Sequence, residues 1–388
     1  MKNYRYIFLI LAQFVSLLAF TQSQQLRFEQ IGTKEGLSDL NVMCIMQDSR
    51  GFIWIGTRYG LNRYDGHQFK TFYSDPSDSN SLSNNYVRCI TEDAKGNIWV
   101  ATAGGGFNKF NRKSNQFRQY THQPNNLNSV SGNNVYNITV EKTGKLWIAT
   151  TDGINLFNPE TDNFVHFLSN KTDITTISDN NVTTTYSDKQ GTIWVGTFSG
   201  GLNRFVLKDS TFIRYQVGIK NSGSISGNNI SAIFEDSKHR LWIGTAGKGL
   251  NLFDSKTGKF RQFKHSSDTN SLSNDNILCI NEDNDGNLLI GTENGGISLL
   301  DSKLQNFRNF VNDEIDETSL TSNSVHSLTK DNEGNIWVGL FAGGINLYKK
   351  STDSFNHYKR DSSVGGLSSN FVNGVSCIML NLYRTPKQ

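Results

Sequence analysis

The sequence predicts an all-β protein, a seven-bladed β-propeller with four antiparallel strands in each blade. Three observations point to this fold: a Trp-containing phrase recurs along the chain, its spacing is nearly constant, and each repeat contains four strand patterns. The composition agrees, because a hydrophobic content of 36% with 35 Gly, 25 Phe and 13 Tyr is typical of a large β protein with many tight turns.

The repeat is defined by a hydrophobic strand with Trp in its second position, usually ending in Gly-Thr. Its seven copies centre on Trp54, Trp99, Trp147, Trp194, Trp242, Leu289 and Trp337, with successive steps of 45, 48, 47, 48, 47 and 48 residues. This period lies between those of WD40 and kelch propellers. A single blade cannot bury both of its faces, so we expect the six Trp side chains to form the core between blades. The alternative is that they stack on sugars.

Each repeat contains four strand signals in a fixed order. An inner strand such as Val87 to Thr91 ends in an acidic turn with Gly and is followed by the Trp strand. The third strand has alternating phrases such as Gly60 to Tyr64, and the last has paired aromatic residues, as in Phe117 to Tyr120. Four antiparallel strands per repeat correspond to one propeller blade.

Two segments compete for the outer strand of the seventh blade. The segment from Leu26 to Ile31 precedes the first inner strand and can pair across the junction of the ring, while Phe355 to Tyr358 follows the last complete repeat. In either case we expect a closed ring, because closure removes exposed sheet edges.

The N-terminal residues differ from the repeats. Lys2 and Arg5 precede an apolar run from Ile7 to Phe20, so residues 1–23 are predicted to be a signal peptide. The alternative, a transmembrane anchor, fits less well because a run of about 14 residues is short for a span that needs roughly 20. We therefore expect a periplasmic propeller over residues 24–362, with no membrane span in the mature chain.

The first repeat resembles the two-component regulator propeller repeat. The resemblance is carried by Leu37-Ser38, Asp48, Gly51, Ile53 to Thr57 and Gly60 to Asp65, and it extends over residues 25 to about 372. It implies the periplasmic sensor of a bacterial hybrid two-component system. In that family two propellers usually precede a small β-sandwich, a membrane span, a histidine kinase, a receiver and a DNA-binding module. The resemblance also implies a response to oligosaccharides released by glycan breakdown.

Residues 363–388 depart from the family pattern. An eighth repeat begins at Gly366 to Val372, and the acidic turn and Trp strand that should follow are missing. We expect a truncated or frame-shifted product, or an expressed fragment of the first propeller, which lacks the kinase module. The alternative is a short natural tail on a stand-alone propeller.

The sequence offers no support for catalysis, a cofactor or a metal site. Its seven His residues show no metal-binding spacing, the acidic turns lack a full set of calcium ligands, and neither a nucleophile elbow nor a phosphate-binding loop occurs. The 38 basic and 35 acidic side chains are interspersed, which argues against a nucleic acid partner. Cys44, Cys89 and Cys279 share one repeat position, so we expect free buried thiols rather than disulfides.

Ligand binding is the remaining function. The turns after the Trp strands and the loops leading to the inner strands must emerge on one face of the ring. The turns vary where the rest of the repeat does not, and their candidate binding residues are Arg58, Tyr59, Phe198, Lys248, Glu293 and Phe341. One inner-strand position is equally variable; it holds Met43, Arg88, Tyr136, Thr183, Ser231, Leu278 and His326, of which Arg88, Tyr136 and His326 are the candidates.

Aromatic and cationic residues of this kind can stack on and hydrogen-bond an oligosaccharide or another small periplasmic ligand. The propeller can also contribute to a homodimer. Two alternatives stay open: a secreted polysaccharide lyase, and a protein-interaction scaffold without a small ligand.

Overall fold

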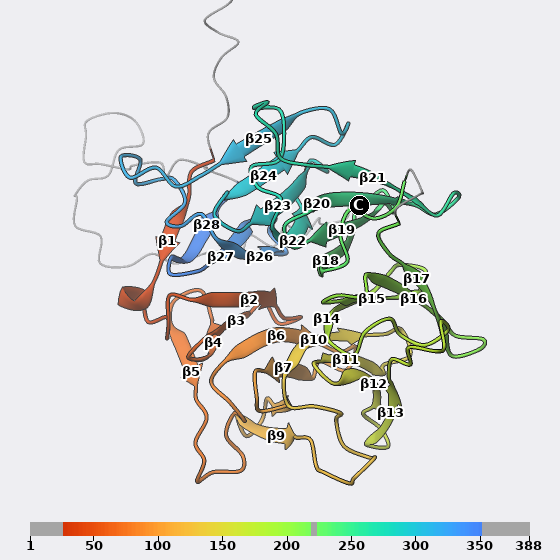
Figure 1. Cartoon of the computed structure of the whole chain (residues 1–388). Helices are drawn as coiled ribbons and strands as arrows, with labels where there is room; N and C mark the ends of the chain where they lie inside the picture. Colours follow the sequence, from red (N-terminus) through yellow and green to blue (C-terminus); the bar gives the residue numbers. More distant parts are fainter. Residues whose placement is uncertain (1–25, 219–222, 351–388) are drawn as a thin grey trace, which may run out of the picture. The chain divides into compact units, whose positions relative to one another are not determined.

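The computed structural model describes residues 26–218 and 223–350, which form seven four-stranded antiparallel sheets arranged as the blades of a ring (Figure 1). The seven-bladed β-propeller predicted from the sequence is confirmed. The inner strands of neighbouring blades contact one another all the way round, and the first inner strand contacts the last. The predicted signal peptide, the segment Phe355 to Tyr358 and residues 363–388 lie outside the described residues.

In blades 1 to 6 the strands follow one another from the centre of the ring outward. Blades 1 and 2 contain β2 (Val42–Gln47), β3 (Ile53–Thr57), β4 (Gly60–Tyr64), β5 (Phe69–Phe72), β6 (Val87–Glu92), β7 (Ile98–Thr102), β8 (Phe107–Asn111) and β9 (Gln116–Tyr120). Blades 3 and 4 contain β10 (Val135–Val140), β11 (Leu146–Thr150), β12 (Gly153–Asn158), β13 (Asn163–Phe167), β14 (Val182–Ser187), β15 (Ile193–Thr197), β16 (Leu202–Val206) and β17 (Thr211–Tyr215). Blades 5 and 6 contain β18 (Ile230–Glu235), β19 (Leu241–Thr245), β20 (Gly249–Asp254), β21 (Lys259–Phe263), β22 (Ile277–Glu282), β23 (Leu288–Thr292), β24 (Ile297–Leu300) and β25 (Phe307–Phe310).

Blade 7 is built from both ends of the described chain. Its first three strands are β26 (Val325–Lys330), β27 (Ile336–Leu340) and β28 (Gly344–Tyr348), and its outer strand is β1 (Glu29–Ile31). Strand β1 pairs antiparallel with β28, with Ile31 opposite Ile345 (Figure 1). A short 3-10 helix, η1 (Thr33–Glu35), then leads into blade 1. Of the two segments that competed for this place, the one from Leu26 to Ile31 therefore closes the ring. No helix among the described residues is long and apolar enough to cross a membrane.

The second strand of each blade forms the centre of the packing. All five residues of β3, β7, β11, β15, β19, β23 and β27 are buried, because each of these strands is covered by the neighbouring blades. The six Trp side chains are at most 5% exposed. Each indole N–H donates to a carboxylate six residues earlier, in the acidic turn; the bond from Trp54 to Asp48 is 2.8 Å long. The other pairs are Trp99–Asp93, Trp147–Glu141, Trp194–Asp188, Trp242–Asp236 and Trp337–Asp331.

Asp48 also links blade 1 to blade 2. Its carboxylate accepts a hydrogen bond of 2.6 Å from Arg112, which in turn contacts Glu92, and the Asp48 side chain is fully buried. Burial by itself would raise the pKa of Asp48, but the hydrogen bonds from Trp54 and Arg112 outweigh it and hold the pKa below its ordinary value.

We predict that Asp48→Asn lowers the free energy of unfolding by about 3 kcal/mol, because it removes one of the two carboxylates that pair with Arg112 and the charged acceptor of the buried Trp54 indole. Urea denaturation measures the loss. Glu160→Gln is the matched control, because Glu160 pairs with Lys95 on the surface and both side chains are about two-thirds exposed. The control should unfold as the unchanged protein does, and equal effects of the two substitutions would contradict the role assigned to Asp48.

Ring closure makes a second prediction. A chain that begins at residue 33 lacks β1 and leaves the backbone of β28 as an open sheet edge. Compared with a chain that begins at residue 26, it should melt at a lower temperature and associate as its concentration rises. Thermal unfolding and light scattering measure both effects. Identical behaviour of the two chains would show that β1 does not hold the ring closed.

Candidate ligand-binding rim

The turn after each Trp strand lies beside the loop that leads to the inner strand of the same blade. In blade 1 the backbone N–H of Arg58 donates to the carbonyl of Asn41 over 3.1 Å. The same bond recurs in the other blades between Ala103 and Tyr86, Thr151 and Asn134, Phe198 and Asn181, Ala246 and Asn229, Glu293 and Asn276, and Phe341 and Ser324. These turns and loops therefore occupy one face of the ring, which we call the rim face.

Every inner strand carries a β-bulge at the end that reaches the rim face. In blade 1 the register between β2 and β3 shifts between Val42 and Cys44, and the equivalent shift occurs in all seven blades. The residues inside the shifts are the variable inner-strand positions, Met43, Arg88, Tyr136, Thr183, Ser231, Leu278 and His326. A bulge redirects the side chain of the extra residue and is common beside binding sites.

A buried Asn on the third strand fixes each of these loops. Asn62 accepts a hydrogen bond from the backbone N–H of Ser38 and donates to the Ser38 hydroxyl over 2.8 Å. Blades 2 to 5 repeat both bonds with Asn108, Asn155, Asn203 and Asn251, and Asn346 accepts the equivalent backbone bond from Thr321 in blade 7. These residues were not among the candidates predicted from the sequence, although Asn recurs in the third-strand phrase. They hold the rim loops in place, because a buried amide must find partners for both of its polar atoms.

Arg88 lies between two tyrosine rings on the rim face. Its guanidinium carbon is 4.0 Å from the ring centre of Tyr136 and 5.1 Å from that of Tyr86. The Nε and Nη1 atoms of Arg88 are buried and have no hydrogen-bond partner among the described residues. Unpaired buried donors are costly, so an acceptor that reached these two atoms would be stabilising.

Arg58 extends the same arrangement across the ring junction. Its guanidinium carbon lies 5.6 Å from the ring centre of Tyr86 and 5.1 Å from that of Phe341 in blade 7. The Phe341 ring stacks on His326 at 5.8 Å. We call this group the rim cluster; its residues are Arg58, Tyr86, Arg88, Tyr136, His326 and Phe341.

Five of the nine candidates from the sequence belong to the rim cluster, and a sixth, Glu293, lies within electrostatic range of His326. The other three lie elsewhere: Tyr59 packs on the Tyr73 ring, Phe198 is 54% exposed and Lys248 lies against Gly227. Tyr86 was missed. Its signal was available, because the other blades place Asn or Ser at this position before the inner strand.

Comparisons with known proteins identify the repeat and the fold. The family model described as two component regulator propeller matches residues 36–59, 81–104, 176–199, 224–247, 271–294 and 319–341. These six segments are two component regulator propeller repeats. Over 83 residues the chain is also 39% identical to histidine kinase P4 of Formosa agariphila, a stretch that makes up 21% of this chain and 6% of that protein.

Solved structures extend the likeness to the whole ring. The extracellular domain assigned to the hybrid two component system BT3049 of B. thetaiotaomicron has a TM-score of 0.73 at 30% identity, over 84% of this chain and 42% of that one. The corresponding domain of BT4673 has a TM-score of 0.67 at 24% identity over 83% and 40%. Virginiamycin B lyase from Staphylococcus aureus shares the fold alone, with a TM-score of 0.61 at 15% identity over 83% and 99%. The chain thus spans less than half the length of the extracellular domains it matches.

The cysteines of this propeller contact neighbouring blades. Cys44, Cys89 and Cys279 are free thiols, and the Cys279 sulfur lies 3.4 Å from the carbonyl oxygen of Val325 in the next blade. Burial raises the pKa of Cys44 and Cys279, and it raises that of Cys89 to about 11. The thiols are therefore protonated at neutral pH and poorly suited to act as nucleophiles. Over residues 26–218 and 223–350, no group of three or more His, Cys, Asp or Glu is placed to hold a metal ion.

His326 is the titratable residue of the rim cluster. Burial lowers its pKa below 6.5; Arg58 lowers it further, while Glu293 partly offsets the shift. The imidazole is therefore neutral at pH 7 and can stack on Phe341 without carrying a charge toward Arg58.

This shift gives the propeller a pH dependence. The unfolded chain takes up a proton at His326 more readily than the folded one, so the contribution of His326 to stability is complete above about pH 6.5 and declines as the pH falls below it. We predict that the free energy of unfolding decreases less between about pH 7.5 and 5.5 in His326→Gln than in the unchanged protein. Urea denaturation at the two pH values measures the difference. Parallel decreases would contradict the burial of a neutral His326.

Proposed function

We propose that this chain is the ligand-sensing propeller of a hybrid two-component sensor in the periplasm, and that its ligand is an oligosaccharide bound at the rim cluster. The matched two component regulator propeller repeats and the likeness to the extracellular domain of BT3049 support the sensor role. The rim face supports the location, because its bulges and turns present variable side chains on a rigid frame. In this proposal the propeller binds and carries out no chemical step.

The chemistry of the rim cluster favours an oligosaccharide with carboxylate or sulfate groups. Arg58 and Arg88 provide two guanidinium groups, each a planar donor suited to an anionic group with two oxygens. Both guanidinium groups stack on the rings of Tyr86, Tyr136 and Phe341 and are therefore already held in place before a ligand binds. This reduces the conformational entropy that the side chains lose on binding. Glu293 accepts a hydrogen bond from the Asn276 side chain, and among the described residues it forms no ion pair with Arg58 or Arg88.

Two donor atoms of Arg88, Nε and Nη1, carry the proposal, because they are buried and no described residue satisfies them. A purely structural arginine at this place would be expected to bond a carbonyl or carboxylate, as Arg112 does with Asp48 and the Gly96 carbonyl. A ligand acceptor would complete Arg88 in the same way.

We predict that acidic oligosaccharides, such as uronate or sulfated disaccharides and tetrasaccharides, bind the chain and that neutral ones of equal length bind more weakly. Arg88→Ala should weaken binding at least tenfold, since a hydrogen bond to a charged group contributes about 1.5–3 kcal/mol. Isothermal titration calorimetry with a panel of both kinds measures this.

Lys248→Ala is the matched control, because it removes a cation from the same face but outside the rim cluster. It should bind as the unchanged chain does. Equal losses in both variants, or no binding of any acidic sugar, would contradict the proposal. Cleavage of the bound sugar would favour a lyase instead.

A further inference from the structure

Blade 6 lacks the indole that fills the space between neighbouring blades elsewhere in the ring. In blade 1 the Trp54 ring lies edge-on to Phe110 of the next blade at 5.1 Å and is stacked with Phe72 of its own blade at 6.0 Å. Trp147 and Trp194 contact Phe205 and Phe253 of their next blades in the same edge-on manner. At the boundary between blades 6 and 7 the Trp position is Leu289.

The surroundings of the missing indole are still present. Tyr348 occupies the place of Phe110, because it lies opposite Ile336 as Phe110 lies opposite Ile98. Asp283 occupies the place of the carboxylates that bind an indole N–H in other blades, and its backbone closes the same turn. The packing partners of a Trp therefore remain, while the Trp itself is replaced by a smaller side chain.

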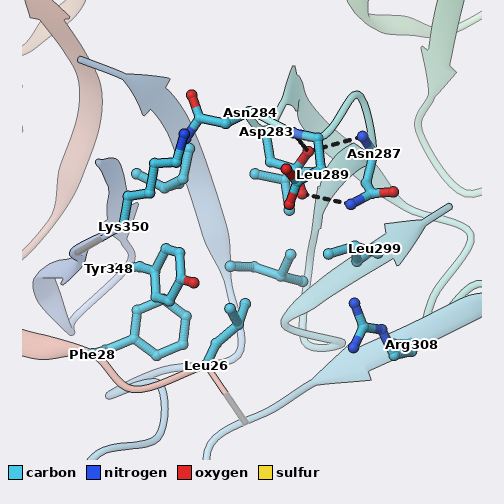
Figure 2. A pocket seen from close by; sticks show the side chains of 13 residues that line it. Leu26, Phe28, Asp283, Asn284, Asn287, Leu289, Leu299, Arg308, Tyr348 and Lys350 are labelled. Carbon is cyan, nitrogen blue, oxygen red and sulfur yellow. Dashed lines mark hydrogen bonds between the residues drawn. The ribbon is translucent and has the colours of Figure 1, made fainter. Parts of the chain in front are cut away.

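A cavity of about 80 Å³ lies at this boundary, several times the space that one water molecule requires. Leu289, Ile297, Leu299 and Ile336 provide apolar walls. Figure 2 shows the rings of Phe28 and Tyr348 on one side of it and Asp283, with its hydrogen bonds to Asn287, on another. We call this cavity the blade 6 slot.

Asp283 retains capacity for one more donor. In blades 2 and 7 one carboxylate oxygen accepts from both an Asn side chain and the indole, as Asp93 does from Asn97 and Trp99. The corresponding oxygen of Asp283 accepts from Asn287 alone among the described residues. Asp283 is also more accessible, being only half-buried where Asp93 is 8% exposed.

We propose that the blade 6 slot binds a small planar aromatic molecule with a ring N–H donor, of which indole is the simplest. The ring would pack edge-on to Tyr348 between apolar walls, and its N–H would donate to the free side of the Asp283 carboxylate. The six indoles elsewhere in the ring occupy equivalent surroundings and make this hydrogen bond. The slot is separate from the rim cluster, so this inference does not rest on the sensor proposal.

The test is fluorine NMR of 5-fluoroindole titrated with the whole chain, because the signal comes from the probe and not from the six Trp residues. We expect a bound signal that unlabelled indole displaces. Benzofuran has the same shape without the N–H donor and should compete about tenfold less well, and Asp283→Asn should weaken binding of 5-fluoroindole by a similar factor.

Leu289→Trp should abolish binding and raise the thermal midpoint, because its own indole occupies the slot. If that variant fails to fold, Asp283→Asn and the benzofuran comparison still test whether indole binds in the blade 6 slot. Glu160→Gln serves as the matched control, because it makes the same acid-to-amide change at an exposed surface position, and it should bind 5-fluoroindole as the unchanged chain does. Absence of a bound signal, equal competition by benzofuran, or loss of binding in Glu160→Gln would each overturn the proposal.

Discussion

The propeller depends on one interaction that is repeated around the ring, an indole packed between two sheets with its N–H bonded to the carboxylate of the preceding turn. A four-stranded blade has two apolar faces and cannot cover both, so its stability comes from its neighbours. The indole supplies both the contact area and a polar anchor, which fixes where the second strand lies relative to the acidic turn. Strand β1, from the N-terminal end of the described chain, pairs with β28 and completes the sheet of blade 7. Each blade of the closed ring therefore packs against a neighbour on both sides.

This repeated frame determines where function can arise. The buried Asn residues hold the leading loops, and the bulges present one side chain per blade at the rim face. Those side chains are not part of the apolar cores between blades, so they are free to differ. The result is an asymmetric group of arginines and aromatic rings on a nearly symmetric support. The blade 6 slot arises differently, because there the packing position itself has changed from Trp to Leu289.

The regular part of the molecule could be predicted from the sequence, because strand order and blade number follow directly from the spacing of the Trp phrase and the turn signals. The rim cluster could be predicted only in part. Arg58 and Phe341 meet because ring closure brings blade 7 beside blade 1. Tyr86 contacts Arg58 from the loop that leads to β6 in blade 2. The absence of Trp at Leu289 was visible in the sequence. The sequence could not show whether neighbouring side chains fill the space left by the missing indole, because that depends on the packing of blades 6 and 7, which no repeat pattern specifies.

Native-state amide hydrogen exchange, followed strand by strand, tests most directly whether each indole seals the boundary between two blades. We predict that the amides of β23 and β27, on either side of the boundary that lacks an indole, exchange faster than those of β7 and β11, on either side of a boundary that has one. Uniform protection across these four strands, or slower exchange at β23 and β27, would contradict the central role of the indole.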